Sequence, residues 1–165
     1  MAAFIFGIKG LDNLLSTTLY PGATIVVAGH PGAGKTIFAT TVCYSNARYN
    51  RRCLYLSFQE SKSKLYRVEN LGMDLDRVEK DGLFKFVNLP VTLSSEAIAD
   101  HINNLLAEYS PDIVVIDSIN AVLELERDPN RRAWLQNYFY QLAEMINGLA
   151  VIITELPFGE ERLKL

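Results

Sequence analysis

The chain has 165 residues, 49% of them hydrophobic, and a formal net charge of −3. These values suit one packed globular domain over residues 1–165, exclude a disordered segment, and give no support to a uniformly basic nucleic-acid coat. No stretch approaches the roughly 18 apolar residues that span a bilayer, and the N-terminus lacks the features of a signal peptide, so we expect a cytoplasmic protein with no membrane partner.

Strand and helix patterns alternate along the chain. The predicted strands are the apolar runs Thr24–Ala28, Cys53–Phe58, Leu83–Val87, Ile113–Ile116 and Leu149–Ile153. Helical patterns separate them, at about 34–48, 61–72, 74–81, 94–110 and 128–148. This alternation predicts an α/β fold, a three-layer sandwich with a mostly parallel central sheet. Ligands of such a sheet bind at the carboxyl ends of its strands.

The two cysteines, Cys43 and Cys53, fall in a predicted helix and at the start of a predicted strand. No Cys-x-x-Cys pair or Cys/His cluster indicates a metal site. We therefore expect both thiols to be reduced and mostly buried, as small apolar residues.

A glycine-rich segment follows the first predicted strand and precedes the first predicted helix. It matches the phosphate-binding pattern Gly-x-x-x-x-Gly-Lys-[Ser/Thr] and consists of Gly29, His30, Pro31, Gly32, Ala33, Gly34, Lys35 and Thr36. Glycines let successive backbone N–H groups point at phosphate oxygens, and the helix start adds its positive dipole end. Lys35 is expected to reach the β- and γ-phosphates, and the Thr36 hydroxyl to ligate Mg²⁺. The segment therefore predicts nucleotide binding.

Two other strand ends carry candidate functional side chains. Asp117 follows four apolar residues and fits the Walker B aspartate that holds Mg²⁺ through water; the alternative is an Asp that only ends a buried strand. Glu60 is a candidate base that activates water for in-line attack on the γ-phosphate, and Gln59 a candidate amide that orients this water. A solvated carboxylate at the strand end is the competing interpretation of Glu60.

Five segments along nearly the whole chain resemble the KaiC-like branch of the RecA superfamily of P-loop ATPases: Gly7–Asp12, Gly29–Thr36, Leu54–Ser61, Leu71–Asp74 and Val115–Ser118. Many families share the P-loop, whereas the leading Gly-x-x-x-Leu-Asp element and the Leu-Gly-Met-Asp stretch are more selective. The resemblance implies a RecA-type core that binds ATP with Mg²⁺. It also implies a homo-oligomeric ring or filament, or a related ATPase subunit, that completes the site between neighbours.

The chain departs from this family's pattern in two places. Relatives commonly carry Glu-Glu where this chain has Gln59 and Glu60, and the first glutamate looks like the principal base, so we expect slow hydrolysis. Relatives also continue past the strand near Thr154 with further strands and a basic residue for a neighbour's nucleotide. The resemblance therefore predicts a core truncated at its C-terminus, with Thr24–Ala28 as an exposed apolar edge.

More than one function remains open. The leading hypothesis is a slow ATPase of the RecA/KaiC type that acts within an oligomer or on a partner, with a possible link to DNA recombination or repair. The alternative is a nucleotide-dependent assembly or regulatory module that does not hydrolyse ATP. Binding of single-stranded DNA is a further hypothesis, which the charge of the chain does not support.

Overall fold

The computed structural model describes residues 4–15 and 17–157 and contains a five-stranded sheet in the order β1-β5-β4-β2-β3. Every neighbouring pair of these strands is parallel. The strands are β1 (Thr24–Gly29), β2 (Cys53–Ser57), β3 (Phe84–Asn88), β4 (Ile113–Asp117) and β5 (Leu149–Glu155). The predicted α/β fold with a parallel central sheet is therefore confirmed, and it is the arrangement of a RecA-like core.

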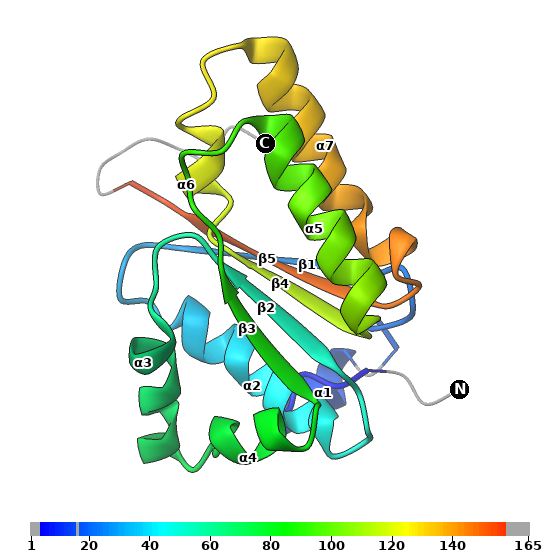
Figure 1. Ribbon diagram of the computed structural model, residues 1–165. Coiled ribbons are helices and arrows are strands. Elements are labelled where there is room, and N and C mark those ends of the chain that lie inside the picture. The colour runs from blue at the N-terminus through cyan, green and yellow to red at the C-terminus, as the bar shows by residue number, and fades with distance from the viewer. Residues whose placement is uncertain (1–3, 16, 158–165) are drawn as a thin grey trace.

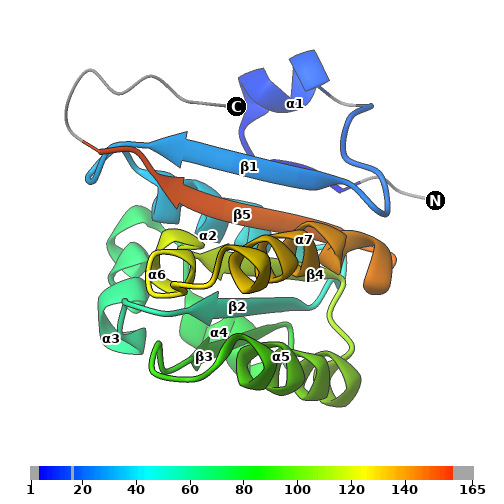
Figure 2. The ribbon, with the colours of Figure 1, turned by 90° about the horizontal axis from the view of Figure 1, so that it is seen from above.

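Helices cover both faces of the sheet and complete the three layers (Figures 1 and 2). The helices are α1 (Lys9–Leu15), α2 (Lys35–Ala47), α3 (Lys62–Leu65), a 3₁₀ helix (Tyr66–Leu71), α4 (Leu75–Lys80), α5 (Ser95–Tyr109), α6 (Asn120–Leu123) and α7 (Pro129–Met145). On one face lie α2, α3 and α4, and on the other lie α5, α6 and α7 (Figure 1). Within the described ranges, no helix is long and apolar enough to cross a membrane.

The helices α3, α4, α5 and α7 begin at side-chain caps, near the starts that the sequence predicts. The side chains of Ser61, Asp74 and Ser94 each accept a hydrogen bond from the backbone N–H three residues further on. Asp128 accepts from the N–H groups of Asn130 and Arg131, before the Pro129 start of α7. These bonds satisfy N–H groups that have no partner within the helix.

Two short helices, α1 and α6, were not predicted from the sequence. The α1 helix has only seven residues, so the helical spacing of its three leucines is too short a pattern from which to recognise a helix. The α6 helix is a single turn directly after β4, too short for a periodic pattern.

Each face of the sheet packs its own core. Leu54, Val114 and Ile152 point to the α5/α7 side, whereas Tyr55 and Val115 point to the α2 side. The strand residues therefore alternate between two apolar layers, as side chains of successive strand residues must. This explains why Ile113–Ile116 reads as an unbroken apolar run.

The cysteine prediction is half right. Cys43 in α2 and Cys53 in β2 are both buried, but they form a disulfide with a Cα–Cα distance of 5.6 Å, so the expectation of two reduced thiols is wrong. The sequence showed two cysteines ten residues apart. It did not show that α2 packs back on β2 and brings the two Cα atoms within bonding range.

The P-loop strand β1 lies at an edge of the sheet and pairs with β5 on one side. Among the described residues no strand pairs with its other side, and Val26 is 50% exposed there. The N-terminal segment does not extend the sheet: Phe4 and Phe6 pack into the α2 core, and the backbone of Ile5 is bonded to the Asn46 side chain. The predicted exposed edge at β1 is therefore present in the described structure.

Candidate functional site

The P-loop joins the carboxyl end of β1 to the start of α2. Gly32 and Gly34 have φ angles of 81° and 89°, a region that favours glycine, so these two positions explain the glycines of the motif. The loop is fixed to the next strand, because Leu156 N–H donates to the Gly29 carbonyl at 3.0 Å. Inside the loop, Ala33 N–H donates to the His30 carbonyl at 3.1 Å. These bonds hold the backbone of the P-loop as a fixed turn at the carboxyl end of β1.

The Lys35 side chain folds back over this loop. Its ammonium donates to the carbonyls of Gly29 and His30 at 2.9 and 2.8 Å, and the residue is only 8% exposed. An ammonium group has three N–H donors, so one of them remains available for another acceptor. Lys35, in the first turn of α2, thus places a positive charge in a fixed position beside the P-loop.

Thr36 and Asp117 meet between α2 and β4. The Thr36 hydroxyl donates to Asp117 Oδ2 at 2.9 Å, and the hydroxyl of Tyr55 donates to the same oxygen at 2.5 Å. Asp117 ends β4 and is 7% exposed. The sequence placed Thr36 and Asp117 in one site, and the structure brings them into direct contact.

Burial changes the pKa values of Asp117 and of Tyr55, which donates to it. Burial raises the pKa of the Asp117 carboxyl, and the charges of Glu60 and Glu155 raise it further, whereas the hydrogen bonds from Tyr55 and Thr36 lower it. Burial also raises the pKa of Tyr55, and the charge of Asp117 adds to this effect. Tyr55 is therefore a protonated donor to the carboxylate near neutral pH.

Glu60 and Gln59 lie at the carboxyl end of β2, across the cleft from the P-loop. The Glu60 backbone is fixed, because its N–H donates to Ser57 Oγ at 2.9 Å and its carbonyl accepts from Asn88 Nδ2 at 2.8 Å. Its carboxylate is paired with Lys64, with N–O distances of 2.9 and 2.8 Å. Gln59 is exposed. The candidate base is thus held by a cation from the next helix.

One cleft of about 380 Å³ brings most of the predicted site residues together. Its lining includes Pro31, Gly32, Gly34, Lys35, Thr36, Gln59, Glu60 and Asp117. The remaining predicted residues, Gly29, His30 and Ala33, belong to the loop but not to the lining of the cleft. Segments from positions 31 to 117 therefore converge at the carboxyl ends of the strands, where the sequence placed them.

Three residues, Tyr55 behind the cleft and Lys64 and Glu155 in its lining, were not assigned a role from the sequence. Tyr55 reads as an ordinary apolar strand residue, and nothing in its spacing points to Asp117. Lys64 lies four residues after Glu60, and this helical spacing is the signal that could have revealed the ion pair. Glu155 at the end of β5 also lines the cleft, and its backbone N–H donates to Asn120 Oδ1 at 2.7 Å.

A second hollow, of about 250 Å³, adjoins the cleft beside α3. It shares Thr36, Ile37, Glu60 and Lys64 with the cleft. Its other walls are mainly apolar and include Val68 and Leu71, of which Leu71 is 61% exposed. An apolar recess thus opens directly from the polar cleft.

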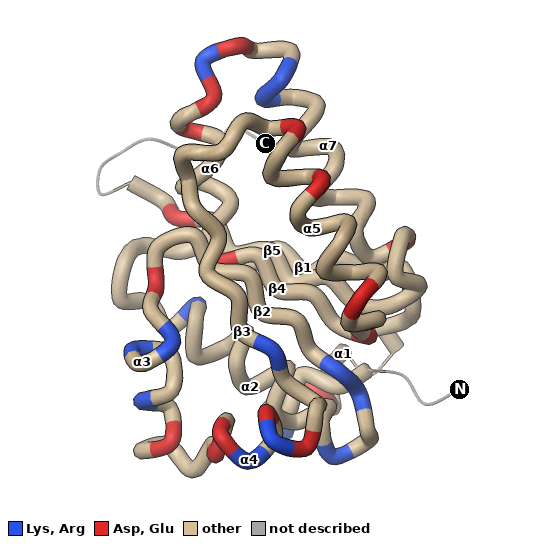
Figure 3. Tube along the Cα trace, in the orientation of Figure 1, with Lys and Arg blue, Asp and Glu red and all other residues tan. Residues whose placement is uncertain are grey.

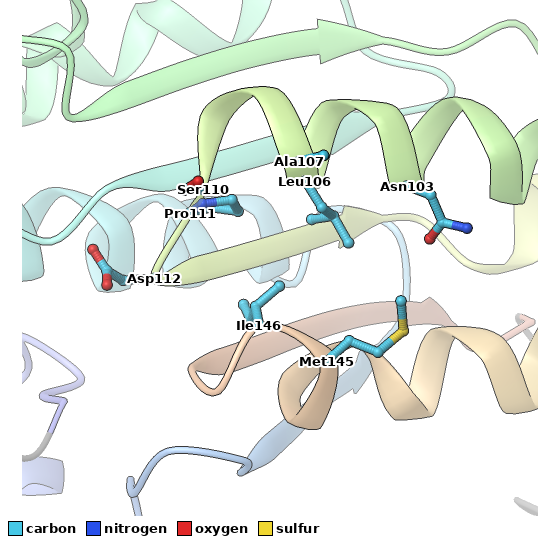
Figure 4. Close-up of a pocket in the computed structure, with 8 residues that line it drawn as sticks. All are labelled: Asn103, Leu106, Ala107, Ser110, Pro111, Asp112, Met145 and Ile146. Carbon is cyan, nitrogen blue, oxygen red and sulfur yellow. The ribbon is translucent and has the colours of Figure 1, made fainter.

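A cavity of about 410 Å³ lies elsewhere, between the ends of α5 and α7 (Figure 4). Leu106, Ile146 and Met145 form apolar walls, and Asp112 stands at one end. These residues precede β4 and β5, so the cavity lies at the amino ends of the strands, opposite the P-loop. None of the predicted site residues lines it.

Charged residues of both signs alternate along the described chain (Figure 3). The loop before α7 and the start of that helix carry Arg127, Arg131 and Arg132 together with Glu124, Glu126 and Asp128. Arg131 is paired with Glu96 at 3.5 Å, and Arg132 donates to the Glu126 carbonyl. This segment is therefore not a basic patch of the kind that binds nucleic-acid backbones.

A cleft built by a glycine-rich loop, a lysine and a strand-end aspartate on an all-parallel sheet defines the P-loop class of proteins. Comparison with known proteins refines this assignment. Residues 5–164 match the family described as "ATPase: KaiC". The chain therefore belongs to the KaiC family of ATPases within the RecA superfamily.

Individual relatives agree with this family. The circadian clock protein KaiC3 of Synechocystis sp. is 30% identical over 155 residues, which are 93% of this chain and 28% of that protein. The DNA repair protein RadA of Haemophilus influenzae is 31% identical over 120 residues, 72% of this chain and 23% of that protein. The circadian clock oscillator protein KaiC of Rippkaea orientalis is 26% identical over 146 residues, 87% of this chain and 26% of that protein. The chain thus spans about a quarter of the length of these relatives.

Proposed function

We propose that this chain binds ATP with Mg²⁺ in the cleft at the carboxyl ends of the strands and hydrolyses it slowly. The observation that carries the proposal is the convergence of Lys35, Thr36 and Asp117 around the P-loop in one cleft. A triphosphate needs a cation, backbone donors and a metal ligand together, and these groups supply all three.

The P-loop is the proposed seat of the β- and γ-phosphates. Its backbone N–H groups lie at the start of α2, where the helix dipole favours negative charge. The remaining N–H of the Lys35 ammonium would donate to a phosphate oxygen, and this charge-assisted bond is among the stronger hydrogen bonds in proteins. Neither contact involves the nucleobase. Both therefore explain the affinity for a nucleotide but no preference for one nucleobase over another.

Thr36 and Asp117 fit a magnesium ion by their chemistry. The Thr36 hydroxyl donates its proton to Asp117 and so keeps oxygen lone pairs for a cation. Hydroxyl and carboxylate oxygens are the hard ligands that Mg²⁺ prefers, with water and phosphate oxygens as the others. A Mg²⁺ ion held there would neutralise charge that develops on the phosphates.

The apolar hollow beside α3 is the proposed site of the nucleobase. It opens from the cleft at Thr36 and Ile37, so a nucleotide whose phosphates lie on the P-loop could reach it. Exposed apolar side chains such as Leu71 would gain buried area against a flat base. This part of the proposal predicts that apolar contacts, more than hydrogen bonds, hold the base.

Glu60 is the proposed base for water attack, with Gln59 as an orienting amide. Their positions on the cleft support these roles, but the Glu60 carboxylate must first leave the ion pair with Lys64. Gln59 has no carboxylate and cannot accept a proton from water. Both features predict slow turnover in the isolated chain.

The same two features favour a second candidate function. A KaiC-type module with a restrained base could bind ATP to control assembly or a partner, without useful turnover. A slow ATPase and a module that only binds ATP would use the same binding site. Only a measurement of turnover therefore separates the two functions. Steady-state phosphate release by the wild-type chain, compared with Glu60→Gln, tells the two functions apart.

We extend the proposal to an assembly of several cytoplasmic subunits or to a related ATPase partner, because no strand of residues 4–15 or 17–157 pairs with the outer edge of β1. A role in recombination or repair rests on the similarity to the DNA repair protein RadA and has no support from the net charge of −3. Mass measurements of the assembly with and without ATP, and turnover with and without single-stranded DNA, test these points.

The direct test of the proposed site is calorimetric. ATP should bind to the wild-type chain more tightly with Mg²⁺ than in EDTA. Thr36→Val should remove most of this difference, because valine has a similar shape but offers no oxygen to the ion. Absence of ATP binding, or an undiminished magnesium effect in Thr36→Val, would contradict the proposal.

A further inference from the structure

Tyr55 is a polar residue in the middle of an apolar strand. It is 0% exposed and lies on the α2 face of the sheet, with the rings of Phe84 and Phe86 at centroid distances of 6.1 and 6.0 Å. A phenylalanine would suit these neighbours without the cost of burying a hydroxyl group. The hydroxyl is compensated by its 2.5 Å hydrogen bond to Asp117 Oδ2.

The sheet register explains how Tyr55 reaches Asp117. Tyr55 lies opposite Val115 on β4, and Asp117 is two residues further along the same face. The tyrosine side chain is long enough to span this diagonal, as its hydrogen bond to Asp117 Oδ2 shows. Because β2 lies between β3 and β4, the phenol ring stands on a paired strand on both sides. It is therefore a rigid support for the carboxylate.

Both hydroxyl groups that donate to Asp117 bond to the same carboxylate oxygen. Tyr55 and Thr36 both donate to Oδ2, and no residue in the described ranges donates to Oδ1. Thr36 stands in the first turn of α2 and Tyr55 inside β2, so the carboxylate is held from two separate elements. This arrangement fixes the carboxylate plane and leaves Oδ1 with its lone pairs available.

We propose that Tyr55 is a positioning residue for the metal site: it holds Oδ2 of Asp117 so that Oδ1 serves a hydrated Mg²⁺ ion. The inference deepens the proposed function and rests on it. It adds a residue that touches neither nucleotide nor metal and acts through Asp117. Groups that orient a metal ligand in this way commonly change metal affinity by about tenfold or more when they are removed.

A purely structural role is the competing explanation, because loss of any buried hydrogen bond lowers stability. The two roles differ in what they predict for metal. A structural role lowers the melting temperature and leaves the metal requirement unchanged. A positioning role changes the magnesium requirement while nucleotide binding without metal stays the same.

The experiment uses Tyr55→Phe, which keeps the aromatic ring and deletes the hydroxyl. Binding of a non-hydrolysable ATP analogue is measured by calorimetry in EDTA and over a series of Mg²⁺ concentrations. We expect the Mg²⁺ concentration for half-maximal tightening to rise about tenfold, with the affinity in EDTA unchanged. Thermal melts establish that the variant is folded.

Tyr66→Phe is the matched control. Its hydroxyl also donates to a carboxylate, Glu79 Oε2, at 2.8 Å, and Tyr66 packs against Phe84 as Tyr55 does. This control removes the same kind of bond outside the cleft and should leave the magnesium midpoint at its wild-type value. In an Asp117→Asn background, Tyr55→Phe should cause no further shift, since the group it positions has lost its charge.

A wild-type magnesium midpoint in folded Tyr55→Phe would overturn the inference and leave the proposed function intact. An equal shift in Tyr66→Phe would also overturn it, because the effect would then follow from general loosening. If the wild-type chain itself shows no magnesium effect, the proposed function fails and the inference fails with it. If Tyr55→Phe is destabilised at the assay temperature, its magnesium midpoint is measured below its melting temperature and judged by the same criteria.

Discussion

The two ends of the parallel sheet each carry a cavity of similar size. The cleft at the carboxyl ends measures about 380 Å³ and the cavity at the amino ends about 410 Å³. They differ in the kind of polar groups that line them. At the amino end, Asp112 accepts the Arg52 backbone N–H at 2.8 Å, and Asn103 accepts the Tyr138 hydroxyl at 2.7 Å. At the carboxyl end, a P-loop, the Lys35 ammonium and the Asp117 carboxylate line one cleft. Volume therefore does not mark the functional end; this combination of an anion-binding loop, a cation and a candidate metal ligand does.

The direction of the helices causes this difference. The P-loop leads into the N-terminus of α2, where unpaired N–H groups favour an anion. The amino-end cavity lies where α5 and α7 finish (Figure 4), and the C-terminus of a helix carries the negative end of its dipole. The carboxyl end of the sheet thus favours an anionic ligand such as a nucleotide, whereas the amino end disfavours it. Substitutions at the two ends test this comparison.

The largest expected effect is on Lys35 at the carboxyl end. Lys35→Ala removes the held cation and should weaken ATP binding by about 100-fold, the range expected for hydrogen bonds to charged groups. Asn103→Ala at the amino-end cavity should leave ATP affinity unchanged. Calorimetric titration of both variants checks the pair. Wild-type affinity in Lys35→Ala would refute the assignment of the loop.

The next effect concerns turnover and not binding. Glu60→Gln removes the proposed base but keeps the size of the side chain, so phosphate release should fall by about 100-fold, typical of a lost general base. ATP affinity should remain within a factor of about two, since glutamine fits the same position. Phosphate release assays under saturating ATP measure the change. Unchanged turnover would show that Glu60 is a strand-end carboxylate without a catalytic role.

The positions of the carboxyl-end residues could be predicted because their signals are local. The P-loop residues are contiguous, and Asp117 directly follows four apolar residues, so the residue pattern was enough to predict where both lie in the fold. The five strands and the parallel sheet followed from apolar runs that alternate with helical patterns. In each case, neighbouring residues determine the feature.

The features that were missed depend on contacts between distant segments. Tyr55 meets Asp117 through the register of β2 and β4, which a single sequence does not define. Cys43 and Cys53 bond because of how α2 returns to β2. The helix α1 has only seven residues and none of them is buried, so its periodic signal is too short to be recognised. These properties belong to packing and could not be read from spacing.

A smaller effect is expected from the ion pair that holds Glu60. Lys64→Met should release the carboxylate and raise turnover about threefold, since an exposed pair of this spacing contributes little free energy. Lys62→Met is the matched control, because Lys62 pairs with Glu79 at 2.6 Å, away from the cleft. Phosphate release by the two variants is compared with that of the wild type. Reduced turnover in Lys64→Met would instead assign Lys64 to the phosphates.

The smallest effect is expected at the amino end. Ala107 is exposed at the rim of the 410 Å³ cavity, next to Leu106 (Figure 4). Ala107→Leu keeps a residue that favours helices and covers apolar surface, so the free energy of unfolding should rise by no more than about 0.5 kcal/mol. ATP affinity and turnover should stay at wild-type values, because the cavity is separated from the P-loop by the length of the sheet. Chemical denaturation and calorimetry measure the two quantities. A clear change in ATP affinity would show that the amino end is coupled to the nucleotide site, and the division of the sheet into one functional and one structural end would be wrong.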